Sequence, residues 1–157
     1  MSLSNDLCVE TVKTYSIYTM LNKFEIKEIN WKDTVPVRHE VLWPNKPPEF
    51  CHIPKDDEGW HFGVYIDDEL SSVASVYPDG KSARLRKFAT LQEYQGQGIG
   101  SALLKHILSF VKEKETKYFW CDARESAIGF YERFGMRREG ECFYKSNIPY
   151  YKMGIAL

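Results

Sequence analysis

The sequence predicts an α/β or α+β domain with a mixed sheet, on two observations. Stretches of alternating apolar residues, typical of strands, lie near both ends of the chain and between two helical patterns. The 157 residues fit one domain, and 43% apolar with 27% charged residues is the ordinary globular range. The 21 basic and 22 acidic residues leave a formal charge of −1, so no overall field favours nucleic acid or an anionic membrane as a partner.

We interpret residues 1–22 as an N-terminal extension, helical or extended, and residues 23–157 as a single domain. No stretch approaches the roughly 18 apolar residues of a transmembrane helix, and the N-terminus lacks the basic and apolar regions of a signal peptide. The four cysteines are far apart and form no CxxC pair, which favours reduced thiols and gives no zinc site. We therefore expect a cytoplasmic protein without a metal ion.

The first predicted elements are a strand and a helix. Residues Lys23–Ile29 alternate apolar and charged side chains, which predicts a strand. Asp33 or Thr34 can cap the helix that follows, with Pro36 in its first turn, where a missing N–H is harmless. This helix is expected to end near Trp43.

Residues 45–59 contain three prolines and a charged run, which predicts a loop long enough to form a lid or a pocket wall. Two strands follow at 60–66 and 70–77, the first with its apolar residues on one buried face. The next strand, 83–91, loses its alternation at Arg86-Lys87. Either a β-bulge lies there or this is an ordinary edge strand.

Two helices and three strands are predicted in the C-terminal half. Apolar residues from Ile99 to Val111 repeat at helical spacing, and the β-prone run Tyr118–Ala123 follows. Residues 127–134 form the second helix of this half, closed by Gly135 at its C′ position. The last predicted strands are 137–145 and 149–155.

The most informative stretch is QGQGIGS, residues 95–101, between a strand and an amphipathic helix. Glycines let the backbone approach a ligand, and a helix N-terminus supplies free N–H groups, so this turn is a cradle for a phosphate or diphosphate. A Walker loop fits poorly because no lysine follows, and a dinucleotide fingerprint fits poorly because Ser101 replaces its third glycine. A third motif, Gln/Arg-x-x-Gly-x-Gly/Ala, is met by Gln95, Gly98 and Gly100.

With this turn the chain resembles the GNAT superfamily of N-acetyltransferases. The resemblance covers Phe88–Leu104 and the sequence AIGFYERFGM at 127–136, which is similar to the family's Ala-x-x-Phe-Tyr-x-x-x-Gly-Phe block. It implies a mixed, mostly antiparallel sheet flanked by helices and splayed between the fourth and fifth strands. It also implies acetyl-CoA as the cofactor, and transfer of the acetyl group to a primary amine by direct attack in a ternary complex.

The resemblance implies which residues hold the cofactor. The pantetheine arm would bond to the backbone of Phe88, Ala89 and Thr90. The diphosphate would lie on backbone amides of the glycine turn, formed by Gln95, Gly96, Gln97, Gly98, Ile99, Gly100 and Ser101. Arg124 stands where many relatives carry an asparagine that touches the cofactor arm, and a surface ion pair is the alternative role for it.

Tyr131 falls at the position of the family's proton donor, and its ordinary pKa near 10 suits protonation of a leaving thiolate. By spacing alone it is a core tyrosine on an apolar helix face. Many relatives carry a glutamate base on the strand before the glycine turn, where this chain has three basic residues between 84 and 87. The base is therefore a water relay, or Asp122 at a strand end, or His61, which titrates in the useful range.

The acceptor pocket of the family is built partly from the first helix. This points to Arg38 and Trp43, with Tyr77 as a further candidate, although charged residues on such a helix commonly form a solvated face. The expected partner is a small-molecule or peptide amine, and the choice between monomer and homodimer stays open. Two other functions remain: a non-catalytic acyl-CoA sensor of the same fold, and a nucleotide-binding protein that uses the glycine turn differently.

Overall fold

The computed structural model describes residues 24–157, so the extension predicted over residues 1–22 lies outside the described residues. The described chain divides into two units. Unit 1 contains residues 24–75 and 87–106, and unit 2 contains residues 76–86 and 107–157. The single domain predicted over 23–157 stays a prediction.

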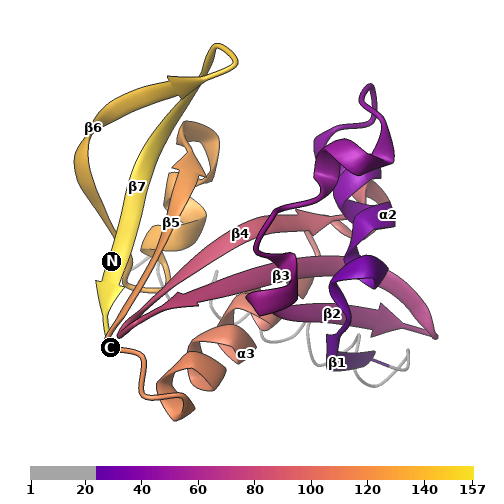
Figure 1. Cartoon of the computed structure of the whole chain (residues 1–157), viewed down its shortest axis with the longest axis horizontal. Helices are drawn as coiled ribbons and strands as arrows, with labels where there is room; N and C mark the ends of the chain where they lie inside the picture. Colours follow the sequence, from indigo (N-terminus) through magenta and orange to yellow (C-terminus); the bar gives the residue numbers. More distant parts are fainter. Residues whose placement is uncertain (1–23) are drawn as a thin grey trace, which may run out of the picture. The chain divides into compact units, whose positions relative to one another are not determined.

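Most predicted elements are present with small shifts of their ends (Figure 1). In chain order they are β1 (Phe24–Ile29), α2 (Trp31–Leu42), β2 (Trp60–Ile66), β3 (Glu69–Asp79), β4 (Ser82–Thr90), α3 (Ile99–Glu113), β5 (Tyr118–Arg124), α4 (Ile128–Glu132), β6 (Arg137–Lys145) and β7 (Ile148–Ala156). Four short 3-10 helices are η1 (Pro48–Cys51), η2 (Asp56–Glu58), η3 (Gln92–Tyr94) and η4 (Glu125–Ala127). The predicted loop 45–59 thus contains two turns of helix.

The strands follow the order β1-β2-β3-β4-β5-β7-β6, and β4 pairs with β5 in parallel. The predicted mixed, mostly antiparallel sheet is therefore confirmed. The parallel register joins Ser82–Arg84 to Tyr118–Trp120, which is only the first part of either strand, as a splayed sheet requires. Because β4 has a neighbour on each side, the edge-strand alternative for this segment is wrong.

The start of α2 differs from the prediction. Its N-cap is Asn30, whose side-chain oxygen accepts a hydrogen bond from the backbone N–H of Lys32 at 2.9 Å. Thr34, one of the two predicted caps, lies inside the helix and donates its hydroxyl to the carbonyl of Trp31. Asparagine, aspartate and threonine are all common N-cap residues, so the position of the cap depended on where β1 ended.

Within unit 1, α2 and the first part of α3 pack on opposite faces of the strands. Val37 of α2 is buried with Val73 of β3 and Ala89 of β4. The neighbouring residue in β4, Phe88, faces the other way and lies beside Gly100 at the start of α3. Strand β2 is consequently buried on both faces, and the single buried face predicted for it is wrong.

The kink predicted in β4 has a local cause in the backbone. Lys87 has φ +54, a left-handed conformation that a regular strand does not contain. Phe88 and Thr90 both lie near Gly100 after this point, while Ala89 joins the core under α2. The positive φ agrees with the β-bulge alternative.

In unit 2, β5, β7 and β6 form an antiparallel sheet with one buried face. Phe119, Cys121 and Met153 lie on that face and have almost no solvent exposure. On the other face, Tyr118 of β5 lies over Gly154 of β7, and its hydroxyl donates to Glu139 of β6.

Candidate active site

The glycine turn of unit 1 is held by its own glutamines. The side-chain amide of Gln95 donates to the carbonyl of Thr90 at 2.8 Å, which ties the turn to the end of β4. The side-chain amide of Gln97 donates to the carbonyl of Glu93 at 3.0 Å, which closes the turn on η3. The backbone N–H of Gln95 donates to the carbonyl of Gln92 at 3.2 Å, so Gln95 does not offer its amide to a ligand as the sequence predicts.

The backbone of the turn requires glycine. Gly96 and Gly98 have φ of +73 and +80, a region that other residues enter at a cost. The carbonyl of Gly98 accepts the hydrogen bond of Ala102 at 3.0 Å, so α3 begins directly after the turn. The first N–H groups of a helix have no partner within the helix, so the start of α3 has the arrangement that the predicted anion cradle requires.

The donor set of this turn fits the diphosphate of coenzyme A. It consists of backbone N–H groups at the positive end of a 15-residue helix, the chemistry that phosphates bind at helix N-termini. A Cβ at position 100 would lie 3.3 Å from the Phe88 ring, so a side chain there would crowd the floor of the cradle. The residues present are thus compatible with the cofactor.

Of the backbone of Phe88, Ala89 and Thr90, predicted to bind the pantetheine arm, the carbonyls of Ala89 and Thr90 already have partners in unit 1. The hydroxyl of Ser72 donates to the carbonyl of Ala89 at 3.2 Å and pairs with the Thr90 hydroxyl at 2.8 Å. The carbonyl of Thr90 accepts from Gln95. These contacts hold the end of β4 rigidly, and the predicted cofactor contacts there stay a prediction.

Tyr131 of unit 2 lies in α4 with 8% of its surface exposed, and its hydroxyl forms a hydrogen bond with the thiol of Cys121 in β5. Burial, and then the Cys121 thiol, raise the pKa of Tyr131 well above its ordinary value of 10. Burial also raises the pKa of Cys121 to about 12. Both groups are therefore neutral at physiological pH, and the phenol keeps its proton.

Asp122, a predicted base, is held between two cations. Its Oδ2 accepts from Arg84 Nη2 at 2.8 Å and from Lys145 Nζ at 3.0 Å. A carboxylate that accepts a proton from an amine needs a free lone pair directed at it. Both cations bind Oδ2, so the lone pairs of Oδ1 are not used by these two bonds, and Asp122 stays a candidate base.

His61, the other predicted base, lies in a buried polar cluster of unit 1 and is 4% exposed. Its Nε2 faces the carbonyl of Asp56 at 2.7 Å, so it carries the proton, and its Nδ1 faces the Ser75 hydroxyl at 2.7 Å. Burial lowers the pKa of His61 below its ordinary value of 6.5. Both ring nitrogens are occupied by protein groups.

Arg38, predicted for the acceptor pocket, belongs to the same cluster and has no exposed surface. Its guanidinium donates to both carboxylate oxygens of Asp56, to the carbonyl of Cys51 and to the hydroxyl of Ser75. This arrangement was not predicted. An arginine among the apolar positions of the first helix was the only signal, and its partner lies 18 residues away in a loop.

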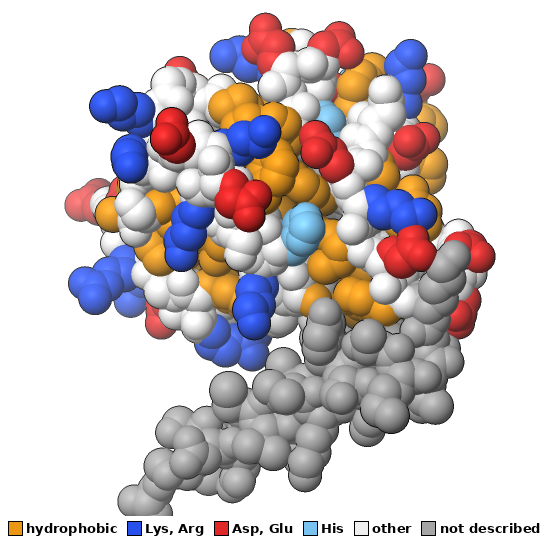
Figure 2. Space-filling model, turned by 90° about the horizontal axis from the view of Figure 1, so that it is seen from below, with side chains coloured by type: hydrophobic (Ala, Val, Ile, Leu, Met, Phe, Trp, Pro, Cys, Tyr) orange, Lys and Arg blue, Asp and Glu red, His pale blue; other side chains and the backbone are white. Residues whose placement is uncertain are grey.

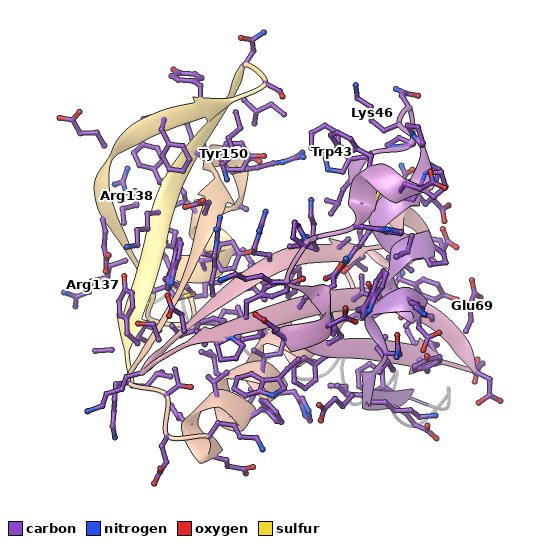
Figure 3. All side chains as sticks on the ribbon, in the orientation of Figure 1. Trp43, Lys46, Glu69, Arg137, Arg138 and Tyr150 are labelled. Carbon is purple, nitrogen blue, oxygen red and sulfur yellow. The ribbon has the colours of Figure 1, made fainter. Side chains whose placement is uncertain are left out.

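The other predicted residues are more accessible, with one exception. Trp43 follows the end of α2 and packs edge-on against Phe50 at 5.1 Å between ring centroids. Figure 3 shows Trp43 near Lys46, and the ammonium of Lys46 lies over the Phe50 ring. Arg124 is exposed at the end of β5, whereas Tyr77 is buried with 8% exposure. Their roles stay predictions.

Residues 24–157 contain no group of three or more His, Cys, Asp or Glu side chains placed to hold a metal ion. Within the same part of the chain, no helix is long and apolar enough to cross a membrane.

A mixed sheet that splays after a short parallel pairing, with a glycine turn opening a helix, defines a class of acyl-CoA-binding folds. The model of the acetyltransferase (GNAT) family matches residues 23–136. The chain belongs to this family, and it is an acyltransferase.

Three similar proteins illustrate the match. The uncharacterized N-acetyltransferase YitI of Bacillus subtilis (strain 168) is 35% identical over 128 residues, covering 76% of this chain and 86% of that protein. The ribosomal-protein-S18-alanine N-acetyltransferase of Escherichia coli has a TM-score of 0.72 at 17% identity, over 85% of this chain and 93% of its own. A GNAT acetyltransferase of Elizabethkingia anophelis with acetyl-CoA bound has a TM-score of 0.68 at 19% identity, over 85% and 98%. These structures share the fold.

Proposed function

We propose that this protein transfers the acetyl group of acetyl-CoA to a primary amine by direct attack in a ternary complex. The observation that carries this proposal is the glycine turn, whose positive φ values and helix N-terminus build an anion cradle of backbone N–H groups. Membership of the acetyltransferase family supports the choice of ligand. Acetyl-CoA, when bound, supplies an acetyl group activated as a thioester.

The chain's own residues have two tasks in this reaction. The backbone amides of residues 96–101 bind the diphosphate and fix the cofactor's position. Tyr131 Oη is protonated at physiological pH, and we assign it the protonation of the leaving sulfur; burial raises its pKa above the value near 10 that suits this role, so proton transfer requires the bound thiolate to be close. Cys121 accepts no proton at physiological pH, because its own pKa is raised as well.

The acceptor amine must lose a proton, and we propose a water relay for this step. His61 has both nitrogens bound inside unit 1, and Asp122 Oδ2 is bound by Arg84 and Lys145. A relay through solvent needs no side chain to give up its partners. Asp122 is the second choice, since its side chain is 16% exposed.

The buried His61, with both ring nitrogens bound, and the two cations on Asp122 Oδ2 also support a second candidate, a non-catalytic acyl-CoA sensor of the same fold. A sensor needs the anion cradle but no proton acceptor. It predicts that acetyl-CoA binds and that no amine causes release of free coenzyme A. A cytoplasmic location, homodimer formation and the class of amine stay predictions from the sequence.

The decisive experiment separates binding from turnover. Calorimetry with acetyl-CoA measures binding, and chromatography of free coenzyme A measures turnover with a panel of small amines, amino acids and peptides. Turnover with any acceptor excludes the sensor. Binding without turnover supports the sensor, and absence of both overturns the cofactor assignment.

Replacement of the phenol hydroxyl tests the proton donor. Tyr131→Phe is expected to lower kcat by about tenfold or more, the scale of lost acid catalysis, with nearly unchanged affinity for acetyl-CoA. Tyr144→Phe is the matched control, because Tyr144 is 70% exposed. Unchanged kcat in Tyr131→Phe would remove Tyr131 from the mechanism.

A further inference from the structure

The sheet of unit 2 has a second face that carries Trp120, and we refer to it as the Trp120 face. The register sets Trp120 opposite Gly154 and Asp122 opposite Lys152, so these side chains point to the same side. Residues Phe119 and Cys121, which alternate with them, are buried on the other side. Trp120 itself is only partly buried. The Trp120 face is thus the accessible side of this sheet.

The Trp120 face has an excess of positive charge, although the whole chain has a formal charge of −1. Its cationic side chains, placed by strand pairing, are Arg84, Arg124, Arg137, Lys145 and Lys152. Its carboxylates are Asp122 and Glu139. The surface seen from below carries both blue and red side chains among hydrophobic ones (Figure 2). Because the whole chain is nearly neutral, the excess on the Trp120 face is a local feature.

Aromatic rings hold these cations in place. The guanidinium of Arg84 lies 4.6 Å from the Trp120 ring centroid, and the ammonium of Lys152 lies 4.8 Å from it. Lys145 lies 5.0 Å from the centroid of Tyr150, which stacks with Phe143. A cation over a ring keeps its positive charge and its remaining N–H donors, so it can still bind an anion.

The two carboxylates neutralise only part of this charge. Asp122 binds Arg84 and Lys145 through one oxygen, and Glu139 lies 3.9 Å from Lys152, near the limit for an ion pair. Among the described residues, neither Arg124 nor Arg137 forms an ion pair. An anionic ligand would therefore add attraction that the protein itself does not supply.

The extent of the Trp120 face favours a chain over a small molecule. Tyr150 and Arg137 lie toward opposite ends of the β6–β7 pair (Figure 3). Strand β7 has nine residues, which span about 30 Å at roughly 3.3 Å per residue. A small acceptor would meet one or two of the cations, whereas an extended chain with several anionic groups would meet most of them.

The chemistry of the face favours a polypeptide over a nucleic acid. Single-stranded nucleic acids bind through bases stacked on open aromatic rings, but Arg84 and Lys152 already cover Trp120. Asp122 and Glu139 would also repel closely spaced phosphates. In an extended peptide, successive carboxylates on one side are roughly 7 Å apart. They can therefore lie between Asp122 and Glu139 and avoid facing either carboxylate directly.

We propose that the Trp120 face binds an acidic segment of the polypeptide that carries the acceptor amine. This inference rests on the proposed acetyl transfer, since it names the class of acceptor. It makes the acceptor a peptide or protein, and it makes the face a determinant of specificity.

The test uses the whole chain and fluorescein-labelled 12-residue peptides with free N-termini, in an acidic, a neutral and a basic version. Fluorescence polarisation is expected to show at least tenfold tighter binding of the acidic peptide than of the other two at about 50 mM salt. Binding should weaken strongly near 300 mM salt, because exposed charges are screened. Equal binding of the acidic and neutral peptides would overturn the proposal.

Charge reversal locates the binding site. Lys145→Glu with Lys152→Glu is expected to weaken acidic-peptide binding at least tenfold, and Lys152→Ala, a milder change, to weaken it severalfold. Lys112→Glu, an exposed lysine on α3, is the control and should leave binding unchanged. Equal loss in Lys112→Glu, or displacement of the peptide by a uridine 12-mer at lower concentration than by unlabelled acidic peptide, would contradict the proposal.

Calorimetry with acetyl-CoA on the same preparations keeps the two proposals separate. If acetyl-CoA does not bind but the acidic peptide does, the proposed function fails and the peptide site stands. If acetyl-CoA binds and supports turnover with small amines while the acidic peptide binds no better than the neutral one, the inference fails alone.

Discussion

The guanidinium of Arg38 in α2 binds both carboxylate oxygens of Asp56 in η2, at 3.0 Å each, and neither side chain reaches solvent. Asp56 also accepts the backbone N–H of Ile53, and Arg38 donates to the carbonyl of Cys51. This pair therefore fastens the proline-rich segment 45–59 to the first helix. A bidentate pair with these extra hydrogen bonds compensates for the desolvation of two charges.

Asp56→Asn is expected to lower the free energy of unfolding by about 3–5 kcal/mol, because it leaves a buried guanidinium without its counter-charge. Urea denaturation followed by circular dichroism measures this. Glu58→Gln is the control in the same 3-10 helix, since Glu58 is exposed. Equal stability of Asp56→Asn and the parent protein would show that the pair contributes little.

Stability should fall as the pH decreases below about 6.5, because the pKa of His61 is lowered in the folded state. The unfolded chain then binds a proton at His61 that the folded protein excludes, while above that pH the contribution is fully present. His61→Gln is expected to flatten the slope of unfolding free energy between pH 7 and 5. His52→Gln, at an exposed position, should keep the parent slope. Identical slopes in the parent protein and His61→Gln would contradict this assignment.

Gly154→Ala is expected to destabilise the protein by about 1–3 kcal/mol, because the new methyl group would overlap the Tyr118 ring and Glu139. Gly129→Ala is the matched control, since a Cβ there meets nothing within 4 Å. In a Tyr118→Ala background the cost of Gly154→Ala should shrink, and a double-mutant cycle measures this coupling. Additive effects would mean that Tyr118 is not the obstacle.

Gly98→Ala is expected to weaken acetyl-CoA binding about tenfold, because the left-handed backbone at φ +80 costs other residues roughly 1–2 kcal/mol. Gly80→Ala is the control, with φ +58 in the turn between β3 and β4. It carries similar strain and should lower stability without changing the affinity measured by calorimetry. Equal loss of affinity in both variants would assign the effect to stability alone.

The candidate site could be predicted from the sequence where its chemistry is local. The glycine turn, its place before α3 and the kink near Lys87 follow from glycine spacing and broken alternation within a few residues. The cluster around Arg38 could not be predicted in this way. Its members lie as far as 37 residues apart, and no short pattern reports that a buried arginine will meet an aspartate and a serine from other elements.

By itself, the sequence determined most of the elements, the glycine turn before α3 and the family, because periodicity, helix starts and glycine conformations depend on neighbouring residues. Only the tertiary structure decided the environment of each titratable group. It gave His61 and Asp122 hydrogen-bond partners, and it placed the Tyr131 hydroxyl against the Cys121 thiol. Burial and partners brought together by folding govern the protonation of such groups, and those depend on packing between distant segments.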